Sequence, residues 1–437
     1  MRKNLFKKVL ALTLASTMAF SMAGCGSKGG SSDAKNDDGT ITLNVWHQWS
    51  NDTNELKGKY EEAVKAYEKE NPDVKIKTET LDTEAYKTKI NAEFAGDAKG
   101  IDVFYWWGAG TAKKLVDAGK VMALDDYVTD DVKSKILEGS TSAFEFDGKL
   151  YSVPMFSWYM TLFCNKTMFD KAGATLPTTY DELVDAVKKL KKLDGVTPMA
   201  AGAKDGWNAA FVYQALALRE VGATGVNEML SGKKEFGDEG FKKAAQKVSD
   251  LYEMGAFGDN PLEQGNDDAN AAFENGKAAM RLMGSWFANN VYTDDAATIK
   301  PEEVVALKIP TIADGKGEAT DYCGGFVESF WVNNNTKYKE EAAKFCIYIN
   351  EKMGVASYET GSGFSGWTTP ADESNLNPLF IQIKDLLAEG KQGVLAWDTS
   401  LESEPAAVHN EQVQTLFADG ADIDAFIDEH KAAINGK

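Results

Sequence analysis

Apolar and polar residues follow two different rhythms along the first quarter of the chain. In some segments every second residue is apolar, which predicts half-buried β-strands, and in others apolar residues recur every three to four positions, which predicts amphipathic helices. Alternation of strands and helices at this spacing predicts βαβ units with a mainly parallel sheet. The predicted elements are strands at 41–46, 74–81 and 101–106 and helices at 53–73 and 84–96.

Aromatic and polar residues follow the ends of these three predicted strands. Ligands of open α/β sheets bind beyond the carboxyl ends of the strands, so we expect these residues to face a binding cleft. Successive side chains of a strand point to opposite faces, so Trp106 and Trp107 cannot both enter one core. At least one of these two indoles therefore faces a cleft or solvent. The residues at the strand ends are Trp46, His47, Trp49, Asp82, Trp106 and Trp107.

The same two rhythms continue to the end of the chain. A hairpin turning at Asp147-Gly148 is predicted at 144–154, and a strand at 276–286 ends in Trp286. Residues 361–366 match the spacing of a dinucleotide-binding glycine motif, but a helix precedes them and no helix follows, so a loop is expected. Further helices are predicted at 178–195, 208–222, 339–354, 377–390, 405–417 and 422–434.

Composition narrows the classes of function. The 437 residues include 47 basic and 67 acidic side chains, a net charge of −20 that disfavours nucleic acid as a partner. Three histidines, without close spacing, offer little for a metal site or a histidine-based triad, and we expect no cofactor, metal or catalytic residue. Cys164, Cys323 and Cys346 form no Cys-x-x-Cys pair and are expected to be buried thiols.

The N-terminal residues are typical of an export signal. Four basic residues precede an apolar run at 9–23, and Met22-Ala23-Gly24-Cys25 resembles a bacterial lipobox. The resemblance implies cleavage after residue 24, a lipid on Cys25 and a flexible tether at 25–39, with the protein held on the outer face of the cell membrane. A plain secretory signal is the alternative. Removal of residues 1–24 takes away four positive charges, so the mature chain carries 43 − 67 = −24.

Residues 151–173 carry a resemblance to a known family. Leu162, Phe163, Asn165, Phe169 and Lys171 fit the signature of the family 1 extracellular solute-binding proteins, the sugar-binding components of ABC importers. Cys164 stands where that family usually has tyrosine. The resemblance extends over about residues 40–435.

The resemblance implies a two-lobed, type II periplasmic-binding-protein-like α/β fold with the ligand between the lobes. The first lobe would take 40–150 and 308–351, and the second 151–307 and 352–437. It also implies a monomer that docks on the membrane permease of an ABC transporter. The cleft residues that it implies are Trp46, His47, Trp49, Asp82, Trp106, Trp107, Trp158, Tyr159, Trp207, Asn208, Trp286, Gly324, Gly325, Trp367 and Trp397.

Ten tryptophans spread between positions 46 and 397 suit a carbohydrate site built from many segments. The C–H faces of a sugar stack on aromatic rings, and its hydroxyls need polar partners. More than one aromatic platform favours an oligosaccharide. Two other functions stay open: a secreted glycoside hydrolase, which needs two carboxylates beside the scissile bond, and a lipoprotein that binds a peptide or protein.

Overall fold

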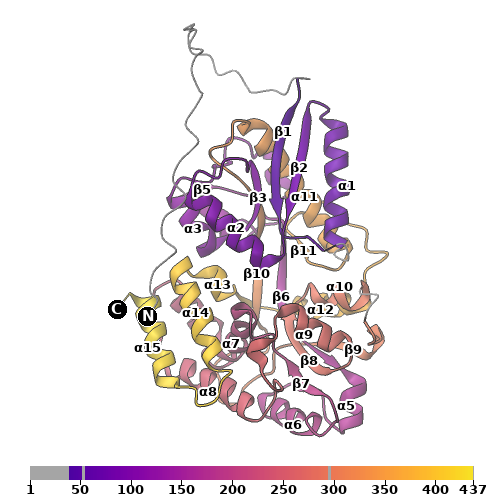
Figure 1. Cartoon of the computed structure of the whole chain (residues 1–437), viewed down its shortest axis with the longest axis vertical. Coiled ribbons are helices and arrows are strands. Elements are labelled where there is room, and N and C mark those ends of the chain that lie inside the picture. The colour runs from indigo at the N-terminus through magenta and orange to yellow at the C-terminus, as the bar shows by residue number, and fades with distance from the viewer. Residues whose placement is uncertain (1–38, 52–54, 294–296, 437) are drawn as a thin grey trace, which may run out of the picture. The chain divides into compact units, whose positions relative to one another are not determined.

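The computed structural model describes residues 39–51, 55–293 and 297–436 (Figure 1). All of the described residues belong to one compact unit within 35–437. The predicted signal segment, Cys25 and nearly all of the predicted tether therefore lie outside the described residues.

The first part of the sheet has the predicted βαβ arrangement. Strand β1 (Ile41–His47) pairs in parallel with β2 (Val74–Thr80) and with β3 (Val103–Trp107). Helices α1 (Glu55–Glu70) and α2 (Thr83–Ala95) connect these strands, and Asp82 caps α2 by accepting a hydrogen bond from the Ala85 amide. The alternating sequence pattern is thus confirmed here.

The second part of the sheet is mixed rather than mainly parallel, which corrects the prediction. Strand β6 (Phe156–Asn165) pairs antiparallel with β8 (Ala278–Gly284) and β9 (Val304–Leu307), and only β7 (Thr197–Ala200) runs parallel to β8. The reason is topological. Strand β6 carries the chain away from the first part of the sheet, whereas β8 and β9 run back towards it.

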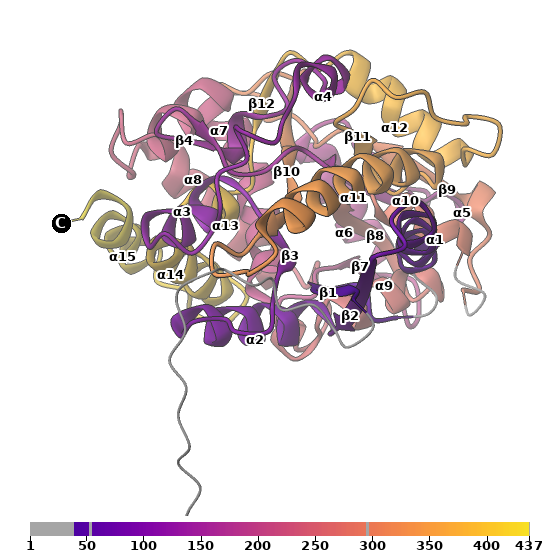
Figure 2. The same ribbon diagram turned by 90° about the horizontal axis from the view of Figure 1, so that it is seen from above.

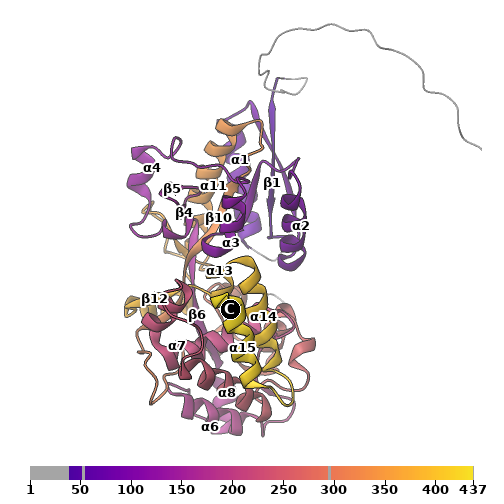
Figure 3. The same ribbon diagram turned by 90° about the vertical axis from the view of Figure 1, so that its left-hand side faces the viewer.

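Strand β10 joins the two parts of the sheet by pairing antiparallel with β3 and β6, and β11 and β12 pair with β6 and β10. The predicted hairpin is present as β4 and β5, which form a separate two-stranded sheet. Helices α1 and α11 lie side by side, as do α14 and α15 (Figures 2 and 3). The bounds are β4 Glu145–Phe146, β5 Lys149–Leu150, β10 Asp321–Val332, β11 Phe364–Ser365 and β12 Gln392–Val394. The helices are α3 Ala109–Asp117, α4 Asp130–Lys135, α5 Lys166–Ala172, α6 Tyr180–Leu190, α7 Gly206–Leu230, α8 Glu239–Glu253, α9 Asn266–Glu274, α10 Phe287–Thr293, α11 Lys339–Glu359, α12 Pro378–Ala388, α13 Trp397–Ser400, α14 Ser403–Thr415 and α15 Ile423–Asn435.

Two separate hydrophobic cores divide the described residues. The first core surrounds β1, β3 and α11, and the second surrounds β6, β8 and α7. We call the parts built on them the first and second lobes. Strand β10 contributes to both cores, with Trp331 in the first and Cys323 in the second. The residue ranges of the lobes stay a prediction. Because Ile309 packs in the second core, we propose that the return crossing lies within β10 rather than at residue 308.

Two buried histidines join the C-terminal helices. His430 Nδ1 donates to the Phe426 carbonyl, so its Nε2 accepts from His409 Nδ1 at 2.9 Å, and Gln214 donates to His409 Nε2. This chain of hydrogen bonds needs both rings neutral. Burial lowers the pKa of His430 to about 4 and that of His409 well below its usual range, with repulsion from His430 as a second cause for His409.

This pair predicts a loss of stability in acid. Below about pH 6.5 the two histidines bind protons in the unfolded chain but stay neutral in the folded one. The free energy of unfolding therefore falls as the pH drops towards about 4. Each histidine contributes up to about 1.4 kcal/mol per pH unit in this range. Chemical denaturation at about pH 7.5 and 5 measures the difference, which should be smaller in His430→Gln. An equal difference in both proteins would contradict the assignment.

Candidate functional site

Four aromatic rings from the second lobe gather around the start of α7. The centroids of Trp158 and Trp286 lie 5.1 Å apart, and Phe211 lies 5.3 Å from both Trp158 and Trp207. The indoles of Trp207 and Trp286 are half-buried, whereas Trp158 is almost fully buried. We call Trp158, Trp207, Phe211 and Trp286 the aromatic cluster. It presents two partly accessible indole rings.

The local sequence explains how these rings meet. Trp207 lies in the first turn of α7, and Trp286 lies two residues after the end of β8. The Trp286 ring folds back over Gly284, where a Cβ atom would lie 2.0 Å from it, so a side chain at 284 would displace the indole. A strand end and a helix start therefore deliver two indoles to the same place.

The first lobe contributes the ring of Trp107 to this site. The Nζ atom of Lys87, on α2, lies 5.2 Å from the Trp107 ring centroid and 5.8 Å from that of Trp207. Both distances are within the range of cation–π attraction. Trp107 packs against the first core and Trp207 against the second, so Lys87 lies between rings that belong to different lobes.

A buried carboxyl group lies beside Trp107. Tyr105 donates a hydrogen bond of 2.5 Å to Glu328 of β10, and the Trp107 indole N–H donates to the same carboxyl. Burial raises the pKa of Glu328 to about 7, although both hydrogen bonds and the nearby Lys87 oppose the shift. Asp398, in α13 of the second lobe, also has a pKa raised by burial and opposed by Lys87. One polar acceptor thus lies beside Trp107, and a second interacts with Lys87.

Helices α3 and α13 form a second contact between the lobes. Thr111 Oγ1 lies 3.3 Å from the carbonyl oxygens of Asp398 and Thr399. A Cβ atom on Gly110 would lie 2.3 Å from the carbonyl oxygens of Ser400 and Leu401. A side chain at position 110 would therefore push the two helices apart.

Several predicted cleft residues belong to the core of the first lobe. His47 and Trp49 pack with Tyr60 and Phe330 and are almost fully buried. Burial, with Lys57 nearby, lowers the pKa of His47 to about 3, so the ring is neutral at physiological pH. These two residues are placed to stabilise the lobe.

Three more predicted residues of the first lobe lie outside the aromatic cluster. Trp46 is buried beneath Lys89, whose Nζ lies 5.8 Å from its ring centroid. Trp106 is also buried, and its indole N–H points to the Thr111 carbonyl at 3.5 Å. Asp82 is exposed and caps α2. Of the two adjacent indoles, Trp107 is more exposed than Trp106, so it is the one that does not enter the core.

Predicted residues of the second lobe divide in the same way. Trp397 packs inside the second core and stacks on His409, and Tyr159 packs against Tyr322. The buried Asn208 accepts a hydrogen bond of 2.8 Å from Arg281. Tyr159 and Asn208 are sequence neighbours of Trp158 and Trp207, but these contacts hold the lobe itself together.

The remaining predicted residues line the boundary between the lobes. Trp367 packs in the first core and donates from its indole N–H to the Pro154 carbonyl at 2.7 Å. Gly324 and Gly325 pair with Tyr159 and Trp158 in the β10–β6 ladder. A Cβ atom on Gly324 would lie 2.0 Å from the Trp158 carbonyl oxygen, so glycine is needed for this approach of the strands.

Sequence reasoning missed Lys87 and Tyr105. Lys87 is one lysine among many on helical surfaces, and no local pattern marks it. Glu328 was also missed, although it carried a signal, because it is the one acid in the apolar strand sequence FVESFWVN. A lone carboxyl in a buried strand needs a partner or a raised pKa, and Glu328 has both.

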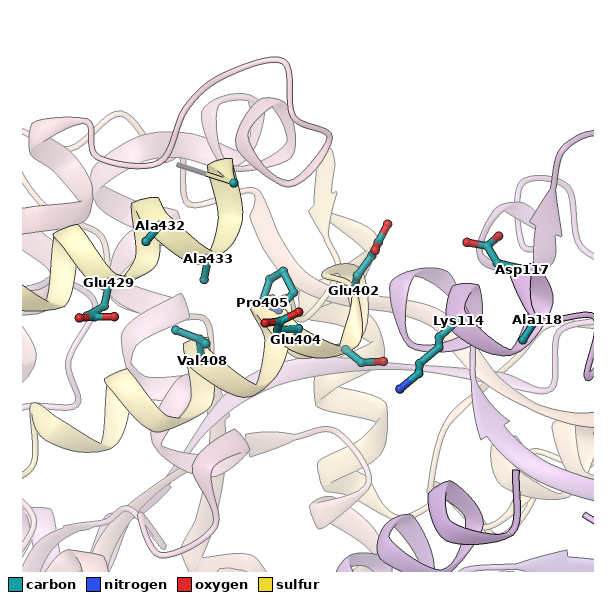
Figure 4. Close-up of a pocket in the computed structure, with 12 residues that line it drawn as sticks. Lys114, Asp117, Ala118, Glu402, Glu404, Pro405, Val408, Glu429, Ala432 and Ala433 are labelled. Carbon is teal, nitrogen blue, oxygen red and sulfur yellow. The ribbon is translucent and has the colours of Figure 1, made fainter. Parts of the chain in front are cut away.

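An open pocket of about 920 Å³ lies elsewhere, between α3 and the helices α14 and α15 (Figure 4). Lys114 and Asp117 line one side and Glu402, Glu404 and Glu429 the other, without a predicted site residue among them. Across residues 39–51, 55–293 and 297–436, no group of three metal-ligating side chains occurs, and no helix is long and apolar enough to cross a membrane.

Comparison with known proteins decides the family. The family of bacterial extracellular solute-binding proteins matches residues 50–355. The chain belongs to this family. Among curated relatives of this solute-binding protein, the multiple sugar-binding protein of Streptococcus mutans is 24% identical over 368 residues, which cover 81% of this chain and 80% of that protein.

Solved structures agree with this assignment. A structure from work on xylan utilization by the thermophilic bacterium Caldanaerobius polysaccharolyticus is 36% identical, covers 90% of this chain and all of that one, and superposes with a TM-score of 0.86. A chitin oligosaccharide binding protein is 21% identical, covers 91% and 98% of the two chains, and has a TM-score of 0.82, which shows the shared fold. The two-lobed solute-binding fold expected from the sequence is thereby confirmed.

The raised pKa of Glu328 predicts a pH-dependent stability. Between about pH 4.5 and 7 the folded chain keeps a proton that the unfolded chain has lost, so the free energy of unfolding decreases as the pH rises through this range. Glu328→Gln removes this dependence. The free energy of unfolding of the variant minus that of the parent should therefore be larger at about pH 8 than at about pH 5, by of order 1–3 kcal/mol.

Urea denaturation of both proteins at the two pH values measures this gain. Glu404→Gln, in the pocket between α3, α14 and α15, provides a control that should show no such gain. The assignment of the pKa fails when Glu328→Gln differs from the parent by the same amount at both pH values.

Proposed function

We propose that this solute-binding protein is the extracellular receptor of an ABC importer for an oligosaccharide. The observation that carries the proposal is the convergence of Trp107, Trp207 and Trp286, all half-buried, around Lys87, which also interacts electrostatically with Asp398. Indoles stack on the C–H faces of sugar rings, and the polar groups pair with hydroxyls. The sugar would be received between the lobes and passed to the permease.

The energies suit this function. Stacking that covers about 100 Å² of apolar surface contributes roughly 2.5 kcal/mol at ~25 cal/mol/Å². Two or three such platforms, with hydrogen bonds to a charged group, offset association costs of at least about 4 kcal/mol and leave the roughly 8 kcal/mol of micromolar binding.

The proposed site comprises Trp107, Trp158, Trp207, Trp286, Lys87, Glu328 and Asp398. Trp46, His47, Trp49, Trp367 and Trp397 are left out because they are packed within the cores.

We further propose a β-linked plant polysaccharide fragment of the xylan type as the ligand. Support comes from the 36% identity to the protein studied for xylan utilization. The lipobox-like sequence before Cys25 supports a lipid anchor on the outer face of the membrane. The protein would act as a monomer and without enzymatic activity, as expected of a receptor.

A panel of oligosaccharides tests the ligand class. Xylo-, chito-, malto- and galacto-oligosaccharides are added to the protein, and the melting temperature is measured, since a ligand that binds the folded state stabilises it. We expect the largest rise with xylo-oligosaccharides and no cleavage products by chromatography. Catalytic cleavage would support a hydrolase instead, and a response to peptides alone would support a peptide receptor.

Truncation of the half-buried indoles tests the site. Trp207→Ala and Trp286→Ala each remove one stacking platform and should weaken binding of the best ligand about 10- to 100-fold by calorimetry. Tyr252→Ala, a half-buried aromatic residue of α8 outside the cluster, is the control and should bind like the parent. Unchanged affinity in both tryptophan variants would remove the aromatic cluster from the site.

A further inference from the structure

Lys87 is the side chain whose charge lies between aromatic rings of the two lobes. Its Nζ atom is 5.2 Å from the centroid of Trp107 and 5.8 Å from that of Trp207. Its helix, α2, belongs to the first lobe together with Trp107, whereas Trp207 packs against the second core. The ammonium group therefore stands at the place where a sugar ring between these two indoles would lie.

Glu84 holds the ammonium at this place, and two further acidic groups interact with it electrostatically. Glu84, one turn earlier on α2, accepts a hydrogen bond from Nζ at 3.0 Å. Glu328 of β10, which is buried, and Asp398 of α13, which is half-buried, both carry carboxyls that Lys87 stabilises in the charged form. Because Asp398 belongs to the second lobe, the lysine is attracted across the boundary by charge as well as by the Trp207 ring.

A neighbouring lysine shows that this placement is specific. Lys89 lies two residues further along α2, and its Nζ is 5.8 Å from the centroid of Trp46. Its salt bridge runs to Glu93 of the same helix, so both of these contacts stay within the first lobe. The two lysines thus make the same kind of ring contact, but only the contact of Lys87 with Trp207 joins the lobes.

We propose that Lys87 is a positioning residue that holds the two lobes together while the site is free of ligand, and that an incoming sugar ring displaces its ammonium from Trp207. The inference rests on the proposed function, since it assigns the displacing group as a sugar. Without ligand, the Lys87 ammonium occupies the space between the Trp107 and Trp207 rings. Contacts of the sugar with both lobes thereby replace the contact between Lys87 and Trp207. Closure of the lobes does not depend on the ligand alone.

Small-angle X-ray scattering of the ligand-free protein tests the proposal. Lys87→Ala should increase the radius of gyration, because the lobes lose the charge that joins them. Lys87→Arg keeps a cation above the rings and should restore the parent value. Lys89→Ala is the matched control and should leave the radius unchanged. Lys87→Gln, which keeps most of the length without the charge, serves as a second variant where Lys87→Ala does not fold.

The outcomes separate this inference from the proposed function. A parent-like radius in both Lys87→Ala and Lys87→Gln, or an equal expansion in Lys89→Ala, would overturn the role of Lys87. This result would leave oligosaccharide binding intact, because the scattering is measured without ligand. Conversely, absence of binding to the glycan panel would remove the proposed function, whereas the expansion of Lys87→Ala would still show that the lysine holds the lobes together.

Discussion

One antiparallel ladder, between β6 and β10, connects the two hydrophobic cores, and the other contacts between the lobes depend on it. Both strands continue beyond the ladder, β10 into the first core and β6 into the second. Neither strand can shift by one residue without turning its buried side chains outward in both lobes. The ladder therefore fixes the register of the lobes while the rest of the boundary is made by side chains.

The tryptophans show how one residue type serves two purposes on this framework. Trp331 and Trp397 fill the cores and are almost inaccessible, and burial of so large a side chain stabilises the lobe around it. Trp107, Trp207 and Trp286 lie at strand ends or a helix start, where the backbone leaves the core and the ring is half-covered. The distinction is therefore one of position at the end of an element rather than of local composition.

The sequence predicted the first lobe well because its elements alternate with a clear period and each is closed by a local signal. The hairpin at Asp147-Gly148 and the capped helix after Thr179 were predicted for the same reason. The site was predicted only in part. Trp286 and Trp397 both follow short apolar runs, yet Trp397 packs against Tyr213 of α7 and Phe241 of α8, which lie far from it in sequence. Long-range packing of this kind leaves no trace in a local pattern, and the same holds for the placement of Lys87.

The glycine at position 110 has a consequence for the geometry of binding. Because Gly110 carries only a hydrogen atom, the backbones of α3 and α13 approach each other closely. This backbone contact, rather than a ligand, limits how far the lobes can close at this end. In the site that we propose, further sugar units would therefore extend away from this contact, on the side where Lys87 and Trp207 lie.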